Sequence, residues 1–397
     1  MTQKILSDCL LSYIDNRGVT PKKLKGDFAK RKTEYMVLSA NHVKSTGLVK
    51  LSEVRYVEKE LYAKWMDDDI QKADILVTSE APAGEVLYWD SDEKVVVGQR
   101  LYALRINPLI ANPLYMSYYL KSPKGQMEIN KNLTGSTVFG ISQKTFDNIV
   151  VDLPNQATQI RIGQILKAID DKISNNTAIN AELEAMAKTI YDYWFLQFEF
   201  PDENGKPYKS SGGKMVWNEE LKREIPAKWT LIHCKDILDV VTGKEDANFA
   251  TENGKYPFFT CSSAISQCDE WKFEGKMLLI AGNGDFNVKY YDGKCNAYQR
   301  TYVLIPRNER YIGVLYQNAI DQLDAFKKGS NGSIVKFITK GDVENIPLLI
   351  PNNEQLLIPL NEILDQIECR KRENQELASL RDFLLPLLMN GQVGFID

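Results

Sequence analysis

The chain has 397 residues, of which 44% are hydrophobic and 26% are charged, and its formal net charge is −4. This length is too great for one ordinary hydrophobic core and predicts two domains with connecting segments. The composition is typical of soluble globular proteins, and the absence of an apolar run of about 18 residues predicts no membrane span. The net charge disfavours a uniformly basic nucleic-acid binder but is compatible with local basic patches.

The numbers and spacing of the cysteines and histidines indicate which metal sites and disulfides are possible. The six cysteines form no CxxC pair, and His42 and His233 are the only imidazoles. A zinc site is therefore not expected, and free thiols in a reducing cytoplasm are the natural interpretation. The first residues, MTQKILSDCLLSY, lack the apolar core of a secretion signal.

Residues 1–150 contain short runs rich in β-branched and aromatic residues, separated by Gly, Pro, Asn and Asp. The runs are EYMVLS (34–39), ADILVT (73–78), GEVLYW (84–89) and KVVVGQRLYALRI (94–106). A helical stretch, NPLYMSYYLKS (112–122), follows them. The pattern predicts a β-rich globular domain with a short helix near its end.

A basic stretch, RGVTPKKLKGDFAKRK at residues 17–32, precedes the first of these runs and contains Lys25 and a single carboxylate, Asp27. Such a stretch can neutralise DNA phosphates, although a solvated charged loop has the same composition. Asn and Gln side chains suit adenine, and Arg suits guanine. The acidic run MDDDI at 66–70 is expected to face away from DNA. The candidate DNA-binding residues of this half are Arg17, Thr20, Lys22, Lys23, Lys30, Arg31, Lys32, Ser39, Asn41, His42, Gln99, Arg100 and Ser136.

A long helical pattern occupies about residues 156–195. Apolar residues and two asparagines recur at alternating steps of four and three, which is a heptad stripe: Ile169, Ile173, Asn176, Asn180, Leu183, Ala187, Ile190 and Trp194. The following segment, PDENGKPYKSSGGKM (201–215), is polar and glycine-rich and predicts a flexible surface loop.

The second half repeats the plan of the first. Residues 230–350 contain the β-type runs YPFFTCSS (256–263), KMLLIAG (276–282), NVKYY (287–291) and QRTYVLI (299–305), and then the helical RYIGVLYQNAID (310–321). A Gly/Ser loop with lysines, FKKGSNGSIVK (326–336), offers main-chain amides for phosphates. The candidate DNA-binding residues of this half are Thr260, Ser262, Ser263, Asn283, Asn287, Lys289, Gln299, Arg300, Lys327, Lys328, Ser330, Asn331 and Ser333.

The two halves align without a gap at their closing segments. GSTVFGISQKTFDNIVVDLPN (135–155) matches GSNGSIVKFITKGDVENIPLLIPNN (329–353), so that Ile141 meets Ile338 and Asn148 meets Asn345. Residues 74–89 likewise resemble residues 276–291, and Gln99-Arg100 corresponds to Gln299-Arg300. The chain therefore carries an internal duplication.

A second long helical pattern follows at about residues 353–391, with a stripe of Leu360, Ile363, Ile367, Asn374, Leu377, Leu384 and Leu388. Pro359 falls in the first turn, where proline is tolerated, and Pro386 is expected to end or kink the helix. The simplest way to bury two such stripes is to pack the helices on each other; two ordinary core helices are the alternative. The residues expected to pair are Ile169, Ile173, Asn176, Leu183, Ile190, Ile367, Asn374, Leu377 and Leu384.

Motifs of common catalytic sites are missing from the sequence. The NPL triplets at Asn107 and Asn112 lack the second proline and the aromatic residue of an amino-methyltransferase, and SSGGKM (210–215) lacks the spacing of a phosphate-binding loop. The acidic residues of PDENGK lie in the predicted loop with no strand to hold a metal nuclease site. No nucleophile elbow accompanies the two histidines. The sequence therefore predicts no catalytic activity.

The whole chain resembles the specificity (S) subunits of Type I restriction-modification systems. The resemblance rests on NRGVTPKK (16–23), GSTVFGISQKTFDNIVVDLP (135–154) and QATQIRIGQILKAIDDKI (156–173). The most specific part is YDYWFLQFEFPDENGKPYKSSGGKMVW (191–217) followed by REIPAKW (223–229), which looks like the central region of the IC subclass. The second half departs from the plainest pattern, because FGIS of the first half becomes KFIT.

This resemblance implies an α+β fold with two β-rich target-recognition domains in a pseudo-two-fold arrangement, separated by two long helices paired as an antiparallel coiled coil. The expected segments are residues 1–155 and 230–352 for the two recognition domains, 156–200 and 353–397 for the helices, and 201–229 for a polar linker.

The resemblance also implies that each domain reads one half of a bipartite site on double-stranded DNA and that the chain is not catalytic. Two methyltransferase (M) subunits that bind AdoMet and two restriction (R) subunits that bind ATP and Mg²⁺ would join it in the cytoplasm, and no cofactor would bind this chain. The alternatives are the recognition subunit of a Type IIG or BcgI-like enzyme, or a coiled-coil scaffold with no role on DNA.

Overall fold

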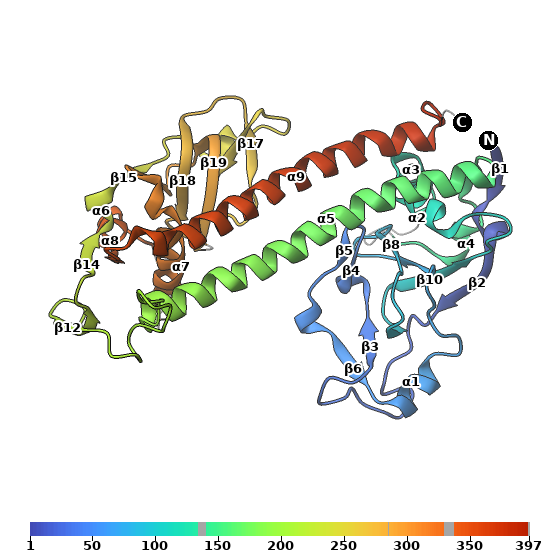
Figure 1. Ribbon diagram of the computed structural model, residues 1–397. Coiled ribbons are helices and arrows are strands. Elements are labelled where there is room, and N and C mark those ends of the chain that lie inside the picture. Colours follow the sequence, from blue (N-terminus) through green and yellow to red (C-terminus); the bar gives the residue numbers. More distant parts are fainter. Residues whose placement is uncertain (134–139, 285, 329–336, 396–397) are drawn as a thin grey trace. The chain divides into compact units, whose positions relative to one another are not determined.

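The computed structural model describes residues 1–397 except 134–139, 285, 329–336 and 396–397 (Figure 1). For residues 324–328 it describes the backbone but not the side chains. The chain divides into two compact units. Unit 1 comprises Met1–Ile173 and Glu376–Asp397, and unit 2 comprises Ser174–Gln375. Unit 2 is one continuous stretch of chain, whereas unit 1 is assembled from two stretches.

Unit 1 is built on short sheets. A four-stranded sheet has the order β2-β10-β7-β8, a three-stranded sheet has the order β6-β3-β9, and the pairs β1-β11 and β4-β5 complete the unit. The strands are β1 (Thr2–Ile5), β2 (Leu10–Asp15), β3 (Tyr35–Leu38), β4 (Val43–Lys44), β5 (Gly47–Leu48), β6 (Arg55–Val57), β7 (Ile75–Thr78), β8 (Val86–Tyr88), β9 (Lys94–Val97), β10 (Leu101–Ile106) and β11 (Val150–Leu153).

Short helices accompany these strands: α1 (Lys59–Trp65), α2 (Pro113–Lys121), α3 (Pro123–Lys131) and α4 (Gln143–Phe146). Helix α2 begins where the sequence specifies it, since the Asn112 side chain accepts a hydrogen bond from the Tyr115 N–H at 3.0 Å and Pro113 occupies the first helical position. The buried face of α2 includes Tyr115, Met116 and Tyr119, which pack into the core around β10.

Unit 2 contains a six-stranded sheet of order β15-β20-β18-β19-β16-β17 and the pairs β14-β21 and β12-β13. The strands are β12 (Met215–Asn218), β13 (Arg223–Pro226), β14 (Thr230–His233), β15 (Leu238–Thr242), β16 (Tyr256–Phe259), β17 (Ser266–Cys268), β18 (Phe273–Ala281), β19 (Val288–Ala297), β20 (Thr301–Pro306) and β21 (Pro347–Ile350). The short helices are α6 (Cys234–Ile237), α7 (Ile312–Lys328) and α8 (Lys340–Glu344).

The duplication predicted from the sequence is repeated in the topology of the two units. The order β2-β10-β7-β8 in unit 1 corresponds to β15-β20-β18-β19 in unit 2, and the pair β1-β11 corresponds to β14-β21. Both closing pairs are antiparallel. The capping boxes at Ser142 and Thr339 also occupy equivalent positions of the aligned segments. The described structure thus contains two units with the same core topology of mixed helices and strands.

Two long helices carry the heptad stripes: α5 (Gln156–Tyr191) and α9 (Ile358–Met389). In unit 2, the Asn180 Nδ2 donates to the Ile367 carbonyl at 3.3 Å. The Asn176 side chain is 1% exposed and donates to the Asn374 Oδ1 at 2.9 Å and to a Glu373 carboxylate oxygen at 2.7 Å. In unit 1, Arg381 of α9 pairs with Asp170 of α5 at 2.9 Å.

Three details differ from the sequence predictions. Helix α5 stops at Tyr191 and is followed by a π-helical turn over Asp192–Leu196. Helix α9 begins only at Ile358, after a 3-10 turn over Glu354–Leu357. It also does not end at Pro386 but continues to Met389, because a proline removes one hydrogen bond but the remaining residues of the last turn keep theirs.

The predicted polar linker, residues 201–229, contains regular structure. Strands β12 and β13 form an antiparallel hairpin, and Ile225 and Trp229 are buried in the core of unit 2. Phe200 lies between Trp229 and Tyr208, with ring centroids 5.0 and 4.6 Å apart. The hairpin begins at Met215, where the predicted flexible loop of residues 201–215 ends, and a few apolar side chains anchor this later part of a segment whose composition is otherwise polar.

We expect Asn176→Ala to lower the free energy of unfolding by about 1–3 kcal/mol, because it removes the buried amide that donates to the partly buried Glu373 and Asn374 of α9. Denaturant titration of the full chain measures this loss. Asn175→Ala is the matched control, since its side chain is exposed on the same turn, and it should change stability by less than about 0.5 kcal/mol. Equal losses in both variants would show that the seam asparagine has no special role.

Candidate nucleic-acid interface

In each unit, one tyrosine on a strand forms an equivalent hydrogen bond to the duplicated segment. In unit 1, the Tyr102 hydroxyl donates to the Ile141 carbonyl at 2.9 Å, and in unit 2 the Tyr302 hydroxyl donates to the Ile338 carbonyl at 2.7 Å. The backbone N–H of Ile141 in turn donates to Ser79, and that of Ile338 donates to Gly282. These bonds attach the duplicated closing segment to the ends of the strands, beside which the candidate DNA-binding loops lie.

Arg17 anchors the basic stretch of unit 1. Its guanidinium forms two hydrogen bonds with Asp15 at 2.9 and 3.0 Å, donates to the Ile141 carbonyl at 3.3 Å and lies 4.0 Å from the centre of the Tyr102 ring. This charge is therefore largely engaged within the unit. Six other basic residues of the stretch are exposed: Lys22, Lys23, Lys25, Lys30, Arg31 and Lys32.

The structure brings several candidates together around one cleft of about 560 Å³ on unit 1. Six predicted residues line it: Thr20, Lys22, Ser39, Asn41, His42 and Gln99. The remaining walls are apolar or charged side chains from the same unit, including Val37, Trp65 and Glu53. The cleft is therefore the place where the largest number of predicted hydrogen-bonding groups converge.

The turn that follows β3 orients His42 in this cleft. The Ser39 N–H donates to the His42 Nδ1 at 3.1 Å, and the Ser39 Oγ lies 3.1 Å from the same nitrogen. Burial of the ring lowers the pKa of His42 below its ordinary value, an effect opposed by Glu53 and reinforced by Lys50. The ring is therefore neutral near pH 7.

Sequence reasoning missed Arg55, which lines the same cleft. Its guanidinium lies 4.8 Å from the centre of the Phe28 ring, a stacking arrangement that holds a cation at the wall of the cleft. Arg55 lies outside the basic stretch, on β6, and only the pairing of β6 with β3 brings it to this surface. No local sequence signal marks such a residue.

Glu85 holds a second turn near the end of the sheet in unit 1. The Ser45 N–H and hydroxyl both donate to the Glu85 carboxylate at 2.8 Å, and Lys44 pairs with it at 3.0 Å. Burial alone would raise the pKa of Glu85, but the Ser45 hydrogen bonds and the Lys44 charge keep it below its ordinary value. Arg100 forms a separate pair with Glu80 at 3.2 Å.

In unit 2, several candidate DNA-binding residues form hydrogen bonds to the turn at residues 260–263. The Asn287 Nδ2 donates to the Cys261 carbonyl at 3.1 Å, and the Lys289 Nζ donates to the Ser262 carbonyl at 2.7 Å. The Thr260 hydroxyl oxygen accepts from the Ser262 N–H at 3.2 Å. Asn287 and Lys289 thus hold the turn that presents Ser262 and Ser263, both of which are exposed.

A second cleft, of about 260 Å³, lies in unit 2 and is lined by the predicted Ser263 and Lys289. It also contains Lys371 and Arg372 of α9, which the sequence analysis did not select. Gln299 and Arg300 are exposed at the start of β20, and Asn283 forms an isolated bridge with Phe337. The cleft of unit 2 is therefore lined by two of the predicted residues, compared with six in the cleft of unit 1.

Several predicted residues cannot be placed. Ser136, Ser330, Asn331 and Ser333 lie outside the described residues. Lys327 and Lys328 belong to helix α7, but their side chains are outside the described part of the structure. Their role on DNA stays a prediction.

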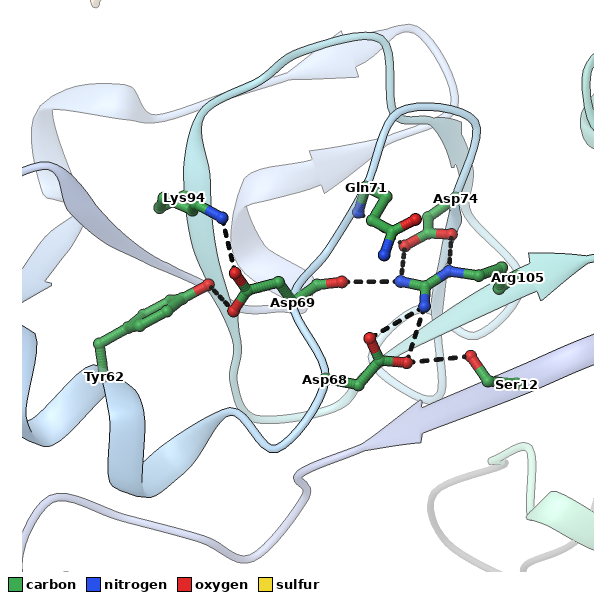
Figure 2. A network of polar contacts seen from close by, with 8 residues as sticks. All are labelled: Ser12, Tyr62, Asp68, Asp69, Gln71, Asp74, Lys94 and Arg105. Atoms are coloured by element: carbon green, nitrogen blue, oxygen red, sulfur yellow. Dashed lines mark hydrogen bonds and ion pairs between the residues drawn. The ribbon is translucent and has the colours of Figure 1, made fainter.

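The acidic run at residues 66–70 has a structural role, as Figure 2 shows. The Arg105 guanidinium donates to Asp68 at 2.8 and 2.9 Å, to Asp74 at 2.9 Å and to the Asp69 carbonyl at 2.7 Å. The Asp69 carboxylate accepts from Tyr62 at 2.7 Å and pairs with Lys94 at 2.6 Å. The network ties the loop before β7 to β9 and β10, so these carboxylates are occupied within the unit.

Neither metal binding nor membrane insertion has support in the described part of the chain. It contains no group of three or more His, Cys, Asp or Glu side chains placed to hold a metal ion. Among the same residues, no helix combines the length and apolar character needed to cross a bilayer.

A family model, related sequences and a solved structure all match this chain to the same family of proteins. A family model described as Type I restriction modification DNA specificity domain matches residues 15–185 and 226–379. The chain is 36% identical over 180 residues to the EcoDI specificity subunit of Escherichia coli, in an alignment that covers 43% of this chain and only 40% of that protein. It is 24% identical over 368 residues to the MjaIX specificity subunit of Methanocaldococcus jannaschii, covering 81% of this chain and 78% of the other.

Among solved structures, the Type I restriction-modification system S subunit from M. genitalium aligns with a TM-score of 0.61. The alignment covers 98% of this chain and 95% of that chain at 19% identity. A likeness at this identity concerns the fold alone, and it supports the mixed α and β architecture described above.

Arg105→Met should destabilise the chain by about 3–5 kcal/mol, because Asp74, whose side chain is 1% exposed, would lose its cation. Thermal and denaturant unfolding would measure the loss. The matched control Lys72→Met removes an exposed ion pair with Asp92 and should leave the unfolding transition unchanged. A stable Arg105→Met variant would show that the network is dispensable.

Glu85→Gln should alter how stability depends on pH. Because the folded-state pKa of Glu85 is lower than the unfolded value of about 4.3, its contribution is present above that value and is lost as the pH falls through the folded pKa. The variant should therefore be less stable than the parent at pH 7 and lose less stability on acidification. Melting temperatures between pH 7 and pH 3 test this, with the exposed Glu93→Gln as control; parallel curves for parent and Glu85→Gln would contradict it.

Proposed function

The chain belongs to the Type I restriction-modification DNA specificity family, because a single family model matches well over half of its residues, and we propose that it recognises a bipartite, asymmetric sequence on double-stranded DNA. In this proposal each unit reads one half of the target. The chain itself is not catalytic and directs partner subunits to the site.

The observation that carries this proposal is the combination of a repeated scaffold with unlike surfaces. Tyr102 and Tyr302 make the same closing bond in the two units. The loops beside these bonds nevertheless differ, since unit 1 presents a basic stretch and a cleft around His42, whereas unit 2 presents the turn at 260–263 held by Asn287 and Lys289. Equivalent scaffolds with different hydrogen-bonding groups suit two different half-sites.

We further propose that α5 and α9 pair as an antiparallel coiled coil that fixes the spacing between the half-sites. The hydrogen bonds from Asn176 and Asn180 to α9 support the pairing, because a polar seam residue fixes register. The proposed pairing residues differ in burial: Asn176, Ile169 and Ile367 are buried, and Ile173, Leu183, Ile190, Asn374, Leu377 and Leu384 are partly buried.

The partners proposed for the chain are two methyltransferase (M) subunits and two restriction (R) subunits in the cytoplasm, with AdoMet bound by the former and ATP and Mg²⁺ by the latter. The duplicated scaffold supports two like partners, since one chain then offers two similar surfaces to identical subunits. The segment from Tyr191 to Trp229 supports assignment to the IC subclass, and the proposed division into residues 1–155, 156–200, 201–229, 230–352 and 353–397 follows from the same resemblance.

We expect replacement of residues 1–155 with the equivalent segment of a relative to change one half of the methylated motif and leave the other half intact. Methylome sequencing of cells carrying the parent chain, the replaced chain or no chain measures the motif directly. Exchange of residues 230–352 is the reciprocal control and should change the opposite half. A simultaneous change of both halves would rule out independent reading by the two units.

A further inference from the structure

The cleft of unit 1 contains a hydrogen-bond donor whose polarity is fixed by the backbone. His42 is the last residue of a 3-10 turn over Ala40–His42, and Ser39 precedes that turn. The Ser39 N–H points at the His42 Nδ1 from 3.1 Å. A backbone N–H can only donate, so Nδ1 is the acceptor and carries no hydrogen.

This contact selects one tautomer of the neutral ring. With Nδ1 accepting, the hydrogen of the imidazole resides on Nε2. The Ser39 hydroxyl, 3.1 Å from the same Nδ1, reinforces the arrangement by donating to it. Protonation of Nδ1 would set its N–H against that of Ser39, so the geometry favours the neutral form with Nε2 as a donor.

The Nε2–H of His42 meets no hydrogen-bond acceptor among the residues that the structure describes, and the ring lines the 560 Å³ cleft. Around the same cleft stand Lys22, whose cation suits a phosphate, and Arg55, held by stacking on Phe28. Gln99 donates to the Val19 carbonyl at 3.3 Å, which fixes its amide at the edge. The cleft therefore offers one oriented donor beside two cations, Lys22 and Arg55, and its lining also includes the carboxylates of Asp27 and Glu53.

We propose that His42 is a specificity-determining residue, which donates its Nε2–H to an acceptor on a base edge in the major groove of the half-site read by unit 1. The acceptors available there are purine N7, guanine O6 and thymine O4, whereas the adenine N6 and cytosine N4 groups are donors and would be rejected. This inference rests on the proposed function, because it assumes that unit 1 contacts DNA.

The test uses the full chain assembled with the methyltransferase subunits of its own system and a duplex bearing the methylated motif. Each base of the unit 1 half-site is replaced in turn by an analogue that removes or weakens its major-groove acceptor: 7-deazapurine for N7, 2-aminopurine for guanine O6 and 4-thiothymine for thymine O4. With the parent chain, one position should show roughly 3- to 10-fold weaker binding, the range for a single hydrogen bond.

His42→Ala supplies the second arm of a double-mutant cycle. The variant should bind the unmodified duplex roughly 3- to 10-fold more weakly and show no additional loss with the analogue at that position. His233→Phe is the matched control, since His233 is the other histidine of the chain and its Nε2 contacts Glu220 at 2.8 Å. The control should keep the full analogue effect.

The outcomes separate this inference from the proposed function. Failure of the assembled parent chain to prefer the motif over unrelated DNA would overturn both. Preference for the motif with no acceptor-dependent position, or an effect of His42→Ala that is equal at every position, would mean a phosphate contact and would overturn the inference alone. The analogue series on the parent chain still decides the question if His42→Ala does not fold.

Discussion

The two β-rich units depend on one long-range contact, the hydrogen bond from a tyrosine hydroxyl on the central strand to the carbonyl of an isoleucine in the duplicated segment. Tyr102 and Tyr302 are positioned by β10 and β20, each of which has a neighbouring strand on both sides. Because the bond connects a strand to a segment later in the chain, it fixes where the candidate DNA-binding loops emerge. The loops can then change in sequence while the sheet beneath them remains in place.

Compensation of charge reconciles the net negative charge of the chain with the candidate DNA-binding surfaces. Two carboxylates of the acidic run before β7 are paired internally, Asp68 with Arg105 and Asp69 with Lys94 and the Tyr62 hydroxyl, which reduces their opposition to the basic stretch at 17–32. Conversely, Arg17 is bound to Asp15 and stacks on Tyr102. It therefore stabilises the start of the basic stretch more than it contributes to the positive electrostatic potential of that stretch. Net charge therefore says less about the partner than the location of the uncompensated groups.

The sequence alone was sufficient for the duplication, the two long helices and part of the strands, because strand runs, helical periodicity and the aligned closing segments are local signals. It was insufficient for the hairpin of β12 and β13, where Ile225 and Trp229 are buried among residues that look like a linker. It also missed Arg55, since strand pairing brings that residue to the cleft. Ser39, Asn41 and His42 were selected as polar residues after a strand, but the tautomer of His42 depends on a backbone contact that no pattern of residue types reveals.

The discontinuity of unit 1 has a consequence for biosynthesis. Leu388 and Met389 of α9 belong to the same buried cluster as Leu6 and Tyr115. During translation, residues 1–173 therefore emerge with an apolar surface that stays uncovered until the last helix has left the ribosome, whereas unit 2 is continuous and has all of its residues earlier. The second unit can thus complete its core first, and premature termination before α9 ends would expose the first unit to aggregation and proteolysis.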